Sequence, residues 1–270
     1  MKIAIAGAAG RMGQMLVRQI AGTPGCSLAG ALEGAGSIAL GRDAGEVAGI
    51  GPDAKSVKGV KIVSDSAAAL ATAQVVIDFT VPAATVALAR IAADKGVAMV
   101  IGTTGLYPAQ TALVHEAAKK VPIMWAANMA LGVNILLALV EKTAAMLDPS
   151  YDIEVMEMHH RHKIDAPSGT ALALGRAAAA GRKVKLEDVW RKSRDGHTGA
   201  RPAGEIGFAA LRGGEEVGVH TVMFAASGER LELSHRAFSR ETYALGAVTS
   251  AKWLEGRKPG LYGMKDVLGL

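Results

Sequence analysis

A dense run of basic and proton-exchanging side chains stands out in the second half of the chain. The sequence reads Glu157-Met-His-His-Arg-His-Lys163, and the turn Pro167-Ser-Gly-Thr170 follows shortly before an alanine-rich helical pattern. Histidine exchanges protons near neutral pH, and the backbone N–H groups at a helix N-terminus attract anions. The pattern therefore predicts a site that holds a small dicarboxylate and gives it a proton.

The opening of the chain carries a glycine-rich turn of the kind that binds a nucleotide. Gly7, Gly10 and Gly13 form the pattern G-x-x-G-x-x-G between an apolar run at residues 2–6 and a helical pattern. In such a turn the first glycine permits the tight bend, the second lets the backbone approach a pyrophosphate, and the third lets the helix pack closely. Glu33 follows about twenty residues later, after a second apolar run, where it can bind an adenosine ribose hydroxyl.

Composition narrows the class of protein. The chain has 270 residues, half of them hydrophobic, which suits one large domain or two modest ones. The net charge of +5 is dispersed, so we expect an anionic small molecule as partner and no nucleic acid. The single cysteine, Cys26, and the lack of an export signal favour the cytoplasm. The apolar stretch at residues 131–140 is too short to span a bilayer, so we expect no membrane partner.

Short apolar runs alternate with helical patterns through the first 125 residues, which predicts a doubly wound, Rossmann-like parallel sheet in an α/β fold. The expected strands are 2–6, 27–32, 60–63, 75–79, 97–101 and 121–125, and the expected helices are 11–20, 67–71, 82–94 and 108–119. In such sheets the loops at the carboxyl ends of the strands carry the site. The glycine-rich segment 34–59 is expected to be a long, mobile loop.

The pattern changes after residue 128. Helical patterns at 131–147 and 168–180 accompany strands with period-two alternation, at 151–158, 204–211, 216–225 and 230–234, which predicts a mostly antiparallel sheet in an α+β substrate domain. The polar segment 191–202 is expected to be a loop over the site. We therefore divide the chain into a dinucleotide-binding domain at 1–128 and a substrate domain at 129–239, with residues 240–270 packing back on the first domain.

Taken together, these motifs resemble the 4-hydroxy-tetrahydrodipicolinate reductase (dihydrodipicolinate reductase) family of the diaminopimelate route to lysine. The resemblance covers essentially the whole chain. It rests on the histidine-rich run and the turn after it, the glycine-rich turn, Asp78-Phe-Thr80, Gly102-Thr-Thr-Gly105 and Ala126-Ala-Asn128. It implies reduction of 4-hydroxy-tetrahydrodipicolinate to tetrahydrodipicolinate by NADH or NADPH, and a homotetramer built through the sheet of the second domain, which is then also an oligomerisation domain.

The resemblance also implies roles for particular residues. His159 matches the acid/base residue, Lys163 the proton donor, and His160 a residue that contacts the substrate, while Gly169 and Thr170 match the turn that grips a substrate carboxylate. The implied cofactor-binding residues are Gly7, Ala8, Ala9, Gly10, Arg11, Met12, Glu33, Gly102, Thr103, Thr104, Ala126, Ala127, Asn128 and Met129.

The chain departs from many family members at three positions, with Gly34 in place of arginine, Met129 in place of phenylalanine, and Val81 in place of arginine in some. An arginine beside the ribose acid can pair the 2′-phosphate of NADPH. Without it, Glu33 repels that phosphate, so we predict a preference for NADH. Arg11 or Arg42 could partly restore affinity for the phosphate.

Plainer interpretations stand beside these. His159 could be a structural histidine, Ser168 is expected to be a helix N-cap rather than a nucleophile, and Asp78 could only cap the helix near Pro82. His197 could be an ordinary loop residue or one that nears the substrate on closure. We expect no metal site, because the cations that flank the histidines would repel one.

Two other functions compete. The first is another two-domain NAD(P)-dependent dehydrogenase of an amino acid or keto acid, such as an aspartate dehydrogenase, which would share the nucleotide half but not the histidine-rich run. The second is a nucleotide-sensing protein without catalytic activity, which would lack a histidine and lysine beside an anion-binding turn.

Overall fold

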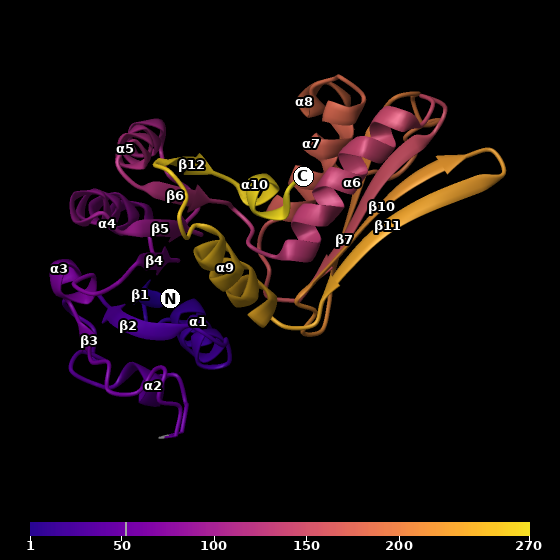
Figure 1. Cartoon of the computed structure of the whole chain (residues 1–270). Helices are drawn as coiled ribbons and strands as arrows, with labels where there is room; N and C mark the ends of the chain where they lie inside the picture. The colour runs from indigo at the N-terminus through magenta and orange to yellow at the C-terminus, as the bar shows by residue number, and fades with distance from the viewer. Residues whose placement is uncertain (52) are drawn as a thin grey trace. The chain divides into compact units, whose positions relative to one another are not determined.

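The computed structural model describes residues 1–51 and 53–270 and divides the chain into two compact units. The first unit comprises Met1–Ala130 and Glu241–Leu270, and the second comprises Leu131–Arg240 (Figure 1). The closing segment of the chain therefore belongs to the same unit as the opening segment. Each unit is built around its own sheet.

The sheet of the first unit has seven strands in the order β12-β6-β5-β4-β1-β2-β3, and every pairing is parallel. The strands are β1 (Lys2–Ala6), β2 (Ser27–Leu32), β3 (Ile62–Val63), β4 (Val75–Asp78), β5 (Ala98–Ile101), β6 (Pro122–Trp125) and β12 (Gly260–Tyr262). The order runs outward in both directions from β1 and β4, as in a doubly wound sheet. This confirms the predicted fold class of the first half.

Helices cover both faces of this sheet (Figure 1). They are α1 (Arg11–Ala21), α2 (Ala44–Val47), α3 (Ser66–Ala69), α4 (Pro82–Lys95), α5 (Pro108–Ala118), α9 (Glu241–Trp253) and α10 (Met264–Leu268). One core cluster joins alternate strand residues such as Ala4 and Met99 to Leu88 of α4 and Val114 of α5. On the other side α9 packs on α1, β4 and β5. Because both faces of the sheet are buried, the sequences of these strands are continuous apolar runs rather than alternating ones.

The segment that we expected to be a mobile loop, residues 34–59, contains one turn of helix, α2. Asp43 caps it by accepting hydrogen bonds from the backbone N–H groups of Gly45 and Glu46, and its other oxygen accepts from Gly59 at 2.7 Å. One carboxylate therefore fastens two distant parts of the segment. Pro52, which also falls in this segment, lies outside the described residues.

The second unit pairs a five-stranded sheet, ordered β11-β10-β7-β9-β8, with α6 (Leu131–Met146), α7 (Gly169–Gly181) and α8 (Leu186–Val189). The strands are β7 (Asp152–His159), β8 (Trp190–Arg191), β9 (Ile206–Arg212), β10 (Gly218–Ala226) and β11 (Glu229–Ala237). The pairings of β10 with β7 and β11 are antiparallel, as predicted, but β9 runs parallel to β7 and β8. The parallel pairing arises because α7 carries the chain back between β7 and β9.

Side chains of the second sheet divide between two faces. Alternate residues such as Val155, Phe208 and Phe224 join the core formed with α6 and α7, and we call their side the inner face. The intervening residues, including Glu154 and Met156, point to the opposite, outer face, because strand side chains alternate. His159 has the same parity as Val155, so it belongs to the inner face.

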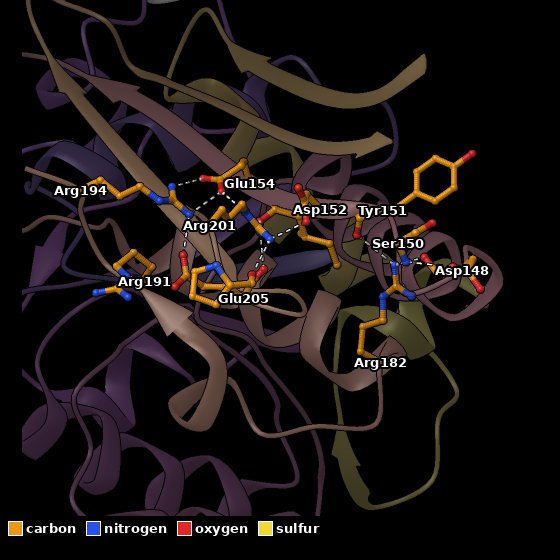
Figure 2. A network of polar contacts seen from close by, with 12 residues as sticks. Asp148, Ser150, Tyr151, Asp152, Glu154, Arg182, Arg191, Arg194, Arg201 and Glu205 are labelled. Atoms are coloured by element: carbon orange, nitrogen blue, oxygen red, sulfur yellow. Dashed lines mark hydrogen bonds and ion pairs between the residues drawn. The ribbon is translucent and has the colours of Figure 1, made fainter. Parts of the chain in front are cut away.

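A network of arginines and carboxylates fixes the polar segment after β8 to the outer face (Figure 2). Both terminal nitrogens of Arg194 donate to Glu154, at 3.0 and 2.8 Å, and one of them also donates to Glu205 at 2.6 Å. Arg201 donates to Glu154 at 3.1 Å and to Asp152 at 2.6 Å. The segment between the two arginines is thus anchored at one carboxylate.

This anchoring corrects our expectation that residues 191–202 form a loop over the histidine site of the same chain. Glu154 lies on the outer face near the start of β7, whereas His159 lies on the inner face at its end. Five residues of strand separate them by about 16–17 Å. The exposed His197 at the loop tip is therefore on the other side of the sheet from His159.

Candidate active site

The glycine-rich turn brings the start of α1 against the end of β1. Gly7 has a φ of +71°, which a side chain would disfavour, and its N–H donates to the carbonyl of Leu32 at 2.9 Å. A Cβ atom on Gly13 would lie only 2.0 Å from the carbonyl oxygen of Gly7. Only glycine lets the helix approach this closely, so the first turn of α1 faces the place where the fingerprint positions a pyrophosphate.

Glu33 stands beside this turn at the end of β2. Its carboxylate accepts a hydrogen bond from the N–H of Ala9 at 2.8 Å. A cavity of about 420 Å³ opens next to it, lined among others by Gly7, Glu33, Gly34, Ser64, Thr80 and Val81. Its size suits part of a dinucleotide, and it places the predicted ribose acid and the predicted pyrophosphate turn in one pocket.

The loops after β4, β5 and β6 meet at the same edge of the sheet. Asp78 is fully buried and accepts from the N–H and hydroxyl of Thr80 at 2.9 and 2.6 Å. Burial raises the pKa of Asp78, and the hydrogen bonds from Thr80 oppose that rise. The residue before α4 is Val81, without a side-chain cap, so the interpretation of Asp78 as the cap of α4 is wrong. Its contacts instead shape the loop beside the cavity.

Backbone contacts join the two later loops. The N–H of Gly102 donates to the carbonyl of Asp78 at 2.8 Å, and that of Ala126 donates to Ile101 at 3.1 Å. The indole of Trp125 donates to the carbonyl of Thr103 at 3.2 Å. These contacts gather the predicted nicotinamide loops along one edge. The side chain of Met129 is buried in the protein, with 1 % of the residue exposed.

His159 ends β7 and is almost completely buried, with 8 % of its surface exposed. Its Nδ1 lies 2.6 Å from the carboxylate of Glu157, two residues back on the same face. Burial lowers the pKa of His159, whereas the hydrogen bond and charge of Glu157 raise it and Lys163 lowers it further. The histidine is thus held in a defined orientation among charged neighbours.

The residue that holds His159 is itself firmly held. Glu157 is 1 % exposed, and Arg212 at the end of β9 donates to its two oxygens, each at 2.8 Å. Burial would raise the pKa of Glu157, but the hydrogen bonds from Arg212 and His159 outweigh it and leave that pKa below its ordinary value. Neither Glu157 nor Arg212 was predicted to have a role from the sequence. In the structure, the pairing of β9 with β7 places Arg212 directly opposite His159.

Lys163 lies in the turn that follows. Its backbone N–H donates to the carbonyl of His160 at 3.1 Å, and its ammonium pairs with Asp165 at 2.7 Å. This hydrogen bond lowers the pKa of Asp165. The N–H of His160 donates to Glu216 at 2.8 Å, which fastens the turn to the segment before β10. The ammonium is therefore near the imidazole, with its charge balanced by a partly exposed carboxylate.

Ser168 begins α7 as its N-cap, which confirms the cap interpretation. Its hydroxyl accepts from the N–H of Ala171 at 3.1 Å, and its own N–H donates to Glu157 at 3.1 Å. Gly169 and Thr170 are the first two residues of the helix, and Gly169 is exposed. The predicted carboxylate-binding turn thus shares Glu157 with the predicted proton-transfer residue.

No group of three or more histidine, cysteine, aspartate or glutamate side chains in residues 1–51 and 53–270 is arranged to hold a metal ion. Within the same residues, no helix combines the length and apolar character needed to cross a membrane.

Both halves of the chain match one family. The profile described as Dihydrodipicolinate reductase, N-terminus, matches residues 1–129, and the profile described as Dihydrodipicolinate reductase, C-terminus, matches residues 132–268. The chain belongs to the dihydrodipicolinate reductase family. The resemblance proposed from the motifs is therefore confirmed over nearly the whole chain.

Individual family members agree. A protein from Methylocella silvestris named 4-hydroxy-tetrahydrodipicolinate reductase is 55 % identical over 270 residues, covering 100 % of this chain and 97 % of the relative. A protein of the same name from Agrobacterium fabrum is 52 % identical over 271 residues, with the same coverage. Among solved structures, a dipicolinate-bound dihydrodipicolinate reductase from Paenisporosarcina has a TM-score of 0.75 at 23 % identity and covers 98 % of both chains, which shows a common fold.

Family membership decides between the competing functions. The chain is an oxidoreductase that draws its reducing equivalents from NADH or NADPH, as its family does. The interpretation as a reductase is thereby confirmed over a nucleotide sensor without catalytic activity.

The close approach of α1 to the glycine-rich turn generates a prediction about dinucleotide binding. Gly13→Ala places a Cβ against backbone atoms that have no room to move, and such overpacking costs about 1–3 kcal/mol. We expect the affinity for the reduced dinucleotide to fall about tenfold or more, measured by titration of its fluorescence. Gly22→Ala, at the other end of α1, is the control, because its nearest neighbour would be 3.8 Å away. Equal affinities of the two variants would contradict the prediction.

Proposed function

We propose that this chain reduces 4-hydroxy-tetrahydrodipicolinate to tetrahydrodipicolinate in lysine biosynthesis, with His159 as the acid/base residue. The observation that carries the proposal is the buried His159, hydrogen-bonded to Glu157. That carboxylate also accepts from the N–H of Ser168 at the start of α7, and the charge of Lys163 acts on the imidazole. In this reaction the 4-hydroxyl leaves as water, and one hydride and one proton are added to the resulting doubly negative ring. The second unit offers the parts that such a substrate needs: a proton carrier, a cation and helix N-terminal amides.

Each residue has a distinct part in this proposal. His159 transfers the proton through Nε2, because Nδ1 is engaged by Glu157. Lys163 leaves its surface partner Asp165 to bind one substrate carboxylate, and the amides of Gly169 and Thr170 bind the other. His160 contacts the ring from the same turn. Clamping both carboxylates fixes the ring for reaction, which is where positioning contributes most to rate.

The first unit fits the dinucleotide through its backbone. The turn from Gly7 to Met12 takes the pyrophosphate, Glu33 takes the ribose, and residues 102–104 and 126–129 lie at the nicotinamide. Met129 would contribute its backbone, since its side chain is buried. When bound, the nicotinamide supplies the hydride. We accordingly assign dinucleotide binding to residues 1–128, with 240–270 packed on them, and substrate binding to residues 129–239.

Steady-state kinetics test the proposed roles of His159 and Lys163. We expect His159→Gln to lower kcat by about 100-fold or more, as loss of a general acid does, with a smaller effect on KM. Lys163→Ala should lower kcat sharply and leave dinucleotide affinity nearly unchanged. The assay supplies the condensation product of pyruvate and aspartate semialdehyde and follows absorbance of the reduced nicotinamide. His115→Gln, an exposed histidine on α5, is the control. Near-normal turnover of His159→Gln would remove its acid/base role.

The cavity beside Glu33 supports a preference for NADH. Its lining consists of one carboxylate, the three hydroxyl residues Ser64, Ser66 and Thr80, and apolar residues and glycines, and it contains no lysine or arginine. A 2′-phosphate placed there would meet the charge of Glu33 without a cation to pair it. Gly34 has open space where a side chain would project, so an arginine can be introduced there without a clash.

We therefore expect kcat/KM to be higher with NADH than with NADPH. Gly34→Arg should shift the ratio toward NADPH by about tenfold or more, because hydrogen bonds to charged groups contribute about 1.5–3 kcal/mol. Gly36→Arg adds the same charge at another open position outside the cavity lining and should change the ratio little. A clear advantage of the unaltered chain for NADPH would overturn this proposal.

The outer face of the second sheet suits assembly into a homotetramer. The partly buried Met156, Met158 and Met223 and the 48 % exposed Leu211 share that face. Apolar groups gathered on one open side of a sheet mark an interaction surface. A cytoplasmic tetramer without nucleic-acid or membrane partners is the assembly that we propose, and the unpaired Cys26 agrees with a reducing compartment.

Sedimentation equilibrium tests this assembly. We expect a tetramer for the unaltered chain and smaller species for Met223→Glu, because the substitution buries a charge at the centre of the interface. Ile38→Glu adds the same charge at a fully exposed position of the first unit and should leave the tetramer intact. A monomeric unaltered chain, or a tetramer that survives Met223→Glu, would show that this face does not hold the assembly.

A further inference from the structure

Glu157 connects three elements through a single buried carboxylate. One of its oxygens accepts from His159 Nδ1 at 2.6 Å and from Arg212 at 2.8 Å. The other oxygen accepts from the backbone N–H of Ser168 at 3.1 Å and from Arg212 at 2.8 Å. The donors therefore come from the end of β7, the start of α7 and the end of β9. Nothing in the proposed reaction requires Glu157 to touch the substrate.

The contact with His159 determines which ring nitrogen carries a proton. An ionised carboxylate can only accept hydrogen bonds, so Nδ1 of His159 must be the donor. The exchangeable site of the imidazole is then Nε2, in both the neutral and the protonated ring. Arg212 keeps Glu157 ionised although it is buried, and the negative charge in turn stabilises the imidazolium.

The contact with Ser168 also links Glu157 to the predicted carboxylate-binding turn. Ser168 caps α7 with its hydroxyl, which also lies 3.2 Å from Nε2 of His220. The ring of His220 meets that of His159 edge-on, with centroids 5.0 Å apart. Burial lowers the pKa of His220 to about 4, so this neighbour is neutral and adds no repulsive charge beside the imidazolium. Glu157 thus fixes the imidazole and the first amides of α7 relative to each other.

We propose that Glu157 is a positioning residue of the reductase, which holds His159 ready to transfer a proton through Nε2 and sets it at a fixed place beside the amides of Gly169 and Thr170. Arg212 serves this arrangement by keeping the carboxylate charged and oriented. The inference rests on the proposed role of His159. It adds a second requirement to that role, because a correctly placed imidazole without its carboxylate partner would carry the proton on either nitrogen.

The variant Glu157→Gln tests the inference, with Glu154→Gln as the matched control. Both glutamates lie on β7 and bind arginine, but Glu154 points to the outer face. We expect kcat of Glu157→Gln to fall by at least about tenfold, with dinucleotide affinity unchanged. Glu154→Gln should keep both values.

The pH profile of kcat supplies a readout that a merely structural role would not move. The groups that face His159 are Glu157, Arg212, Lys163 and His220, and Glu157 is the anion among them. Without this anion the imidazolium loses its proton more readily, so the alkaline limb of the profile moves to lower pH in Glu157→Gln. An unmoved limb together with unchanged kcat would overturn the proposal.

A double substitution separates this inference from the function on which it rests. If Glu157 acts through His159, then Glu157→Gln lowers kcat little further in a His159→Gln background. If His159→Gln loses its activity while Glu157→Gln stays as active as the control Glu154→Gln, the positioning role alone is rejected. Normal activity of His159→Gln would reject the acid/base role itself.

Folding is checked by the thermal midpoint and by dinucleotide binding. Should Glu157→Gln fail to fold, Glu157→Asp is the substitute, because it keeps the charge opposite Arg212 but is one methylene too short to reach all its partners. We expect Glu157→Asp to bind the dinucleotide normally and to lose kcat at least about tenfold. Unaltered kcat of this variant would equally contradict the proposal.

Discussion

A negative charge buried in an apolar core must be paired, and this requirement organises the second unit. Glu157 satisfies it with Arg212, whose two hydrogen bonds come from the far end of a parallel strand. Removing one partner of such a pair leaves an uncompensated charge and is strongly destabilising. The end of β7, the end of β9 and the start of α7 are therefore held together, at the place where we propose the proton carrier and the anion-binding amides.

In the first unit, the glycine-rich turn is shaped mainly by its backbone, through close packing and hydrogen bonds of backbone amides. This binding turn depends on a glycine that lets α1 contact the turn after β1, and on a carboxylate, Glu33, that accepts from a turn amide. A dinucleotide presents phosphates and hydroxyls that backbone groups can bind. A dicarboxylate that must also be protonated needs side chains whose charge can change. In the proposed reaction the two units thus contribute different chemistry.

Local sequence patterns predicted most of the fold. The first two strands were predicted at their observed bounds, because each is a buried apolar run closed by glycine or charge. The three-residue β12 and the two-residue β8 were missed, whereas the equally short β3 was predicted because it lies at the end of the run 60–63. The parallel pairing of β7 with β9 was missed because it depends on where α7 returns the chain.

The same distinction between local and long-range signals applies to the candidate site. The Ser168 cap was predicted correctly, and the histidine-rich run and Glu33 could be proposed as site residues, because their signals are local in sequence. Arg212 and the clamp of Arg194 and Arg201 on Glu154 were not, since each partner lies 40 or more residues away. Ion pairs between residues far apart in the sequence produce no periodic sequence pattern. The same clamp explains why the loop carrying His197 was wrongly expected over the site of its own chain.

A crystal structure with reduced dinucleotide and pyridine-2,6-dicarboxylate, a planar analogue of the substrate, tests the central claim most directly. We expect one carboxylate on the amides of Gly169 and Thr170 and the other on Lys163, with the ring facing Nε2 of His159 while Nδ1 stays on Glu157. A dicarboxylate bound away from these residues, or an imidazole turned off Glu157 in the complex, would contradict it.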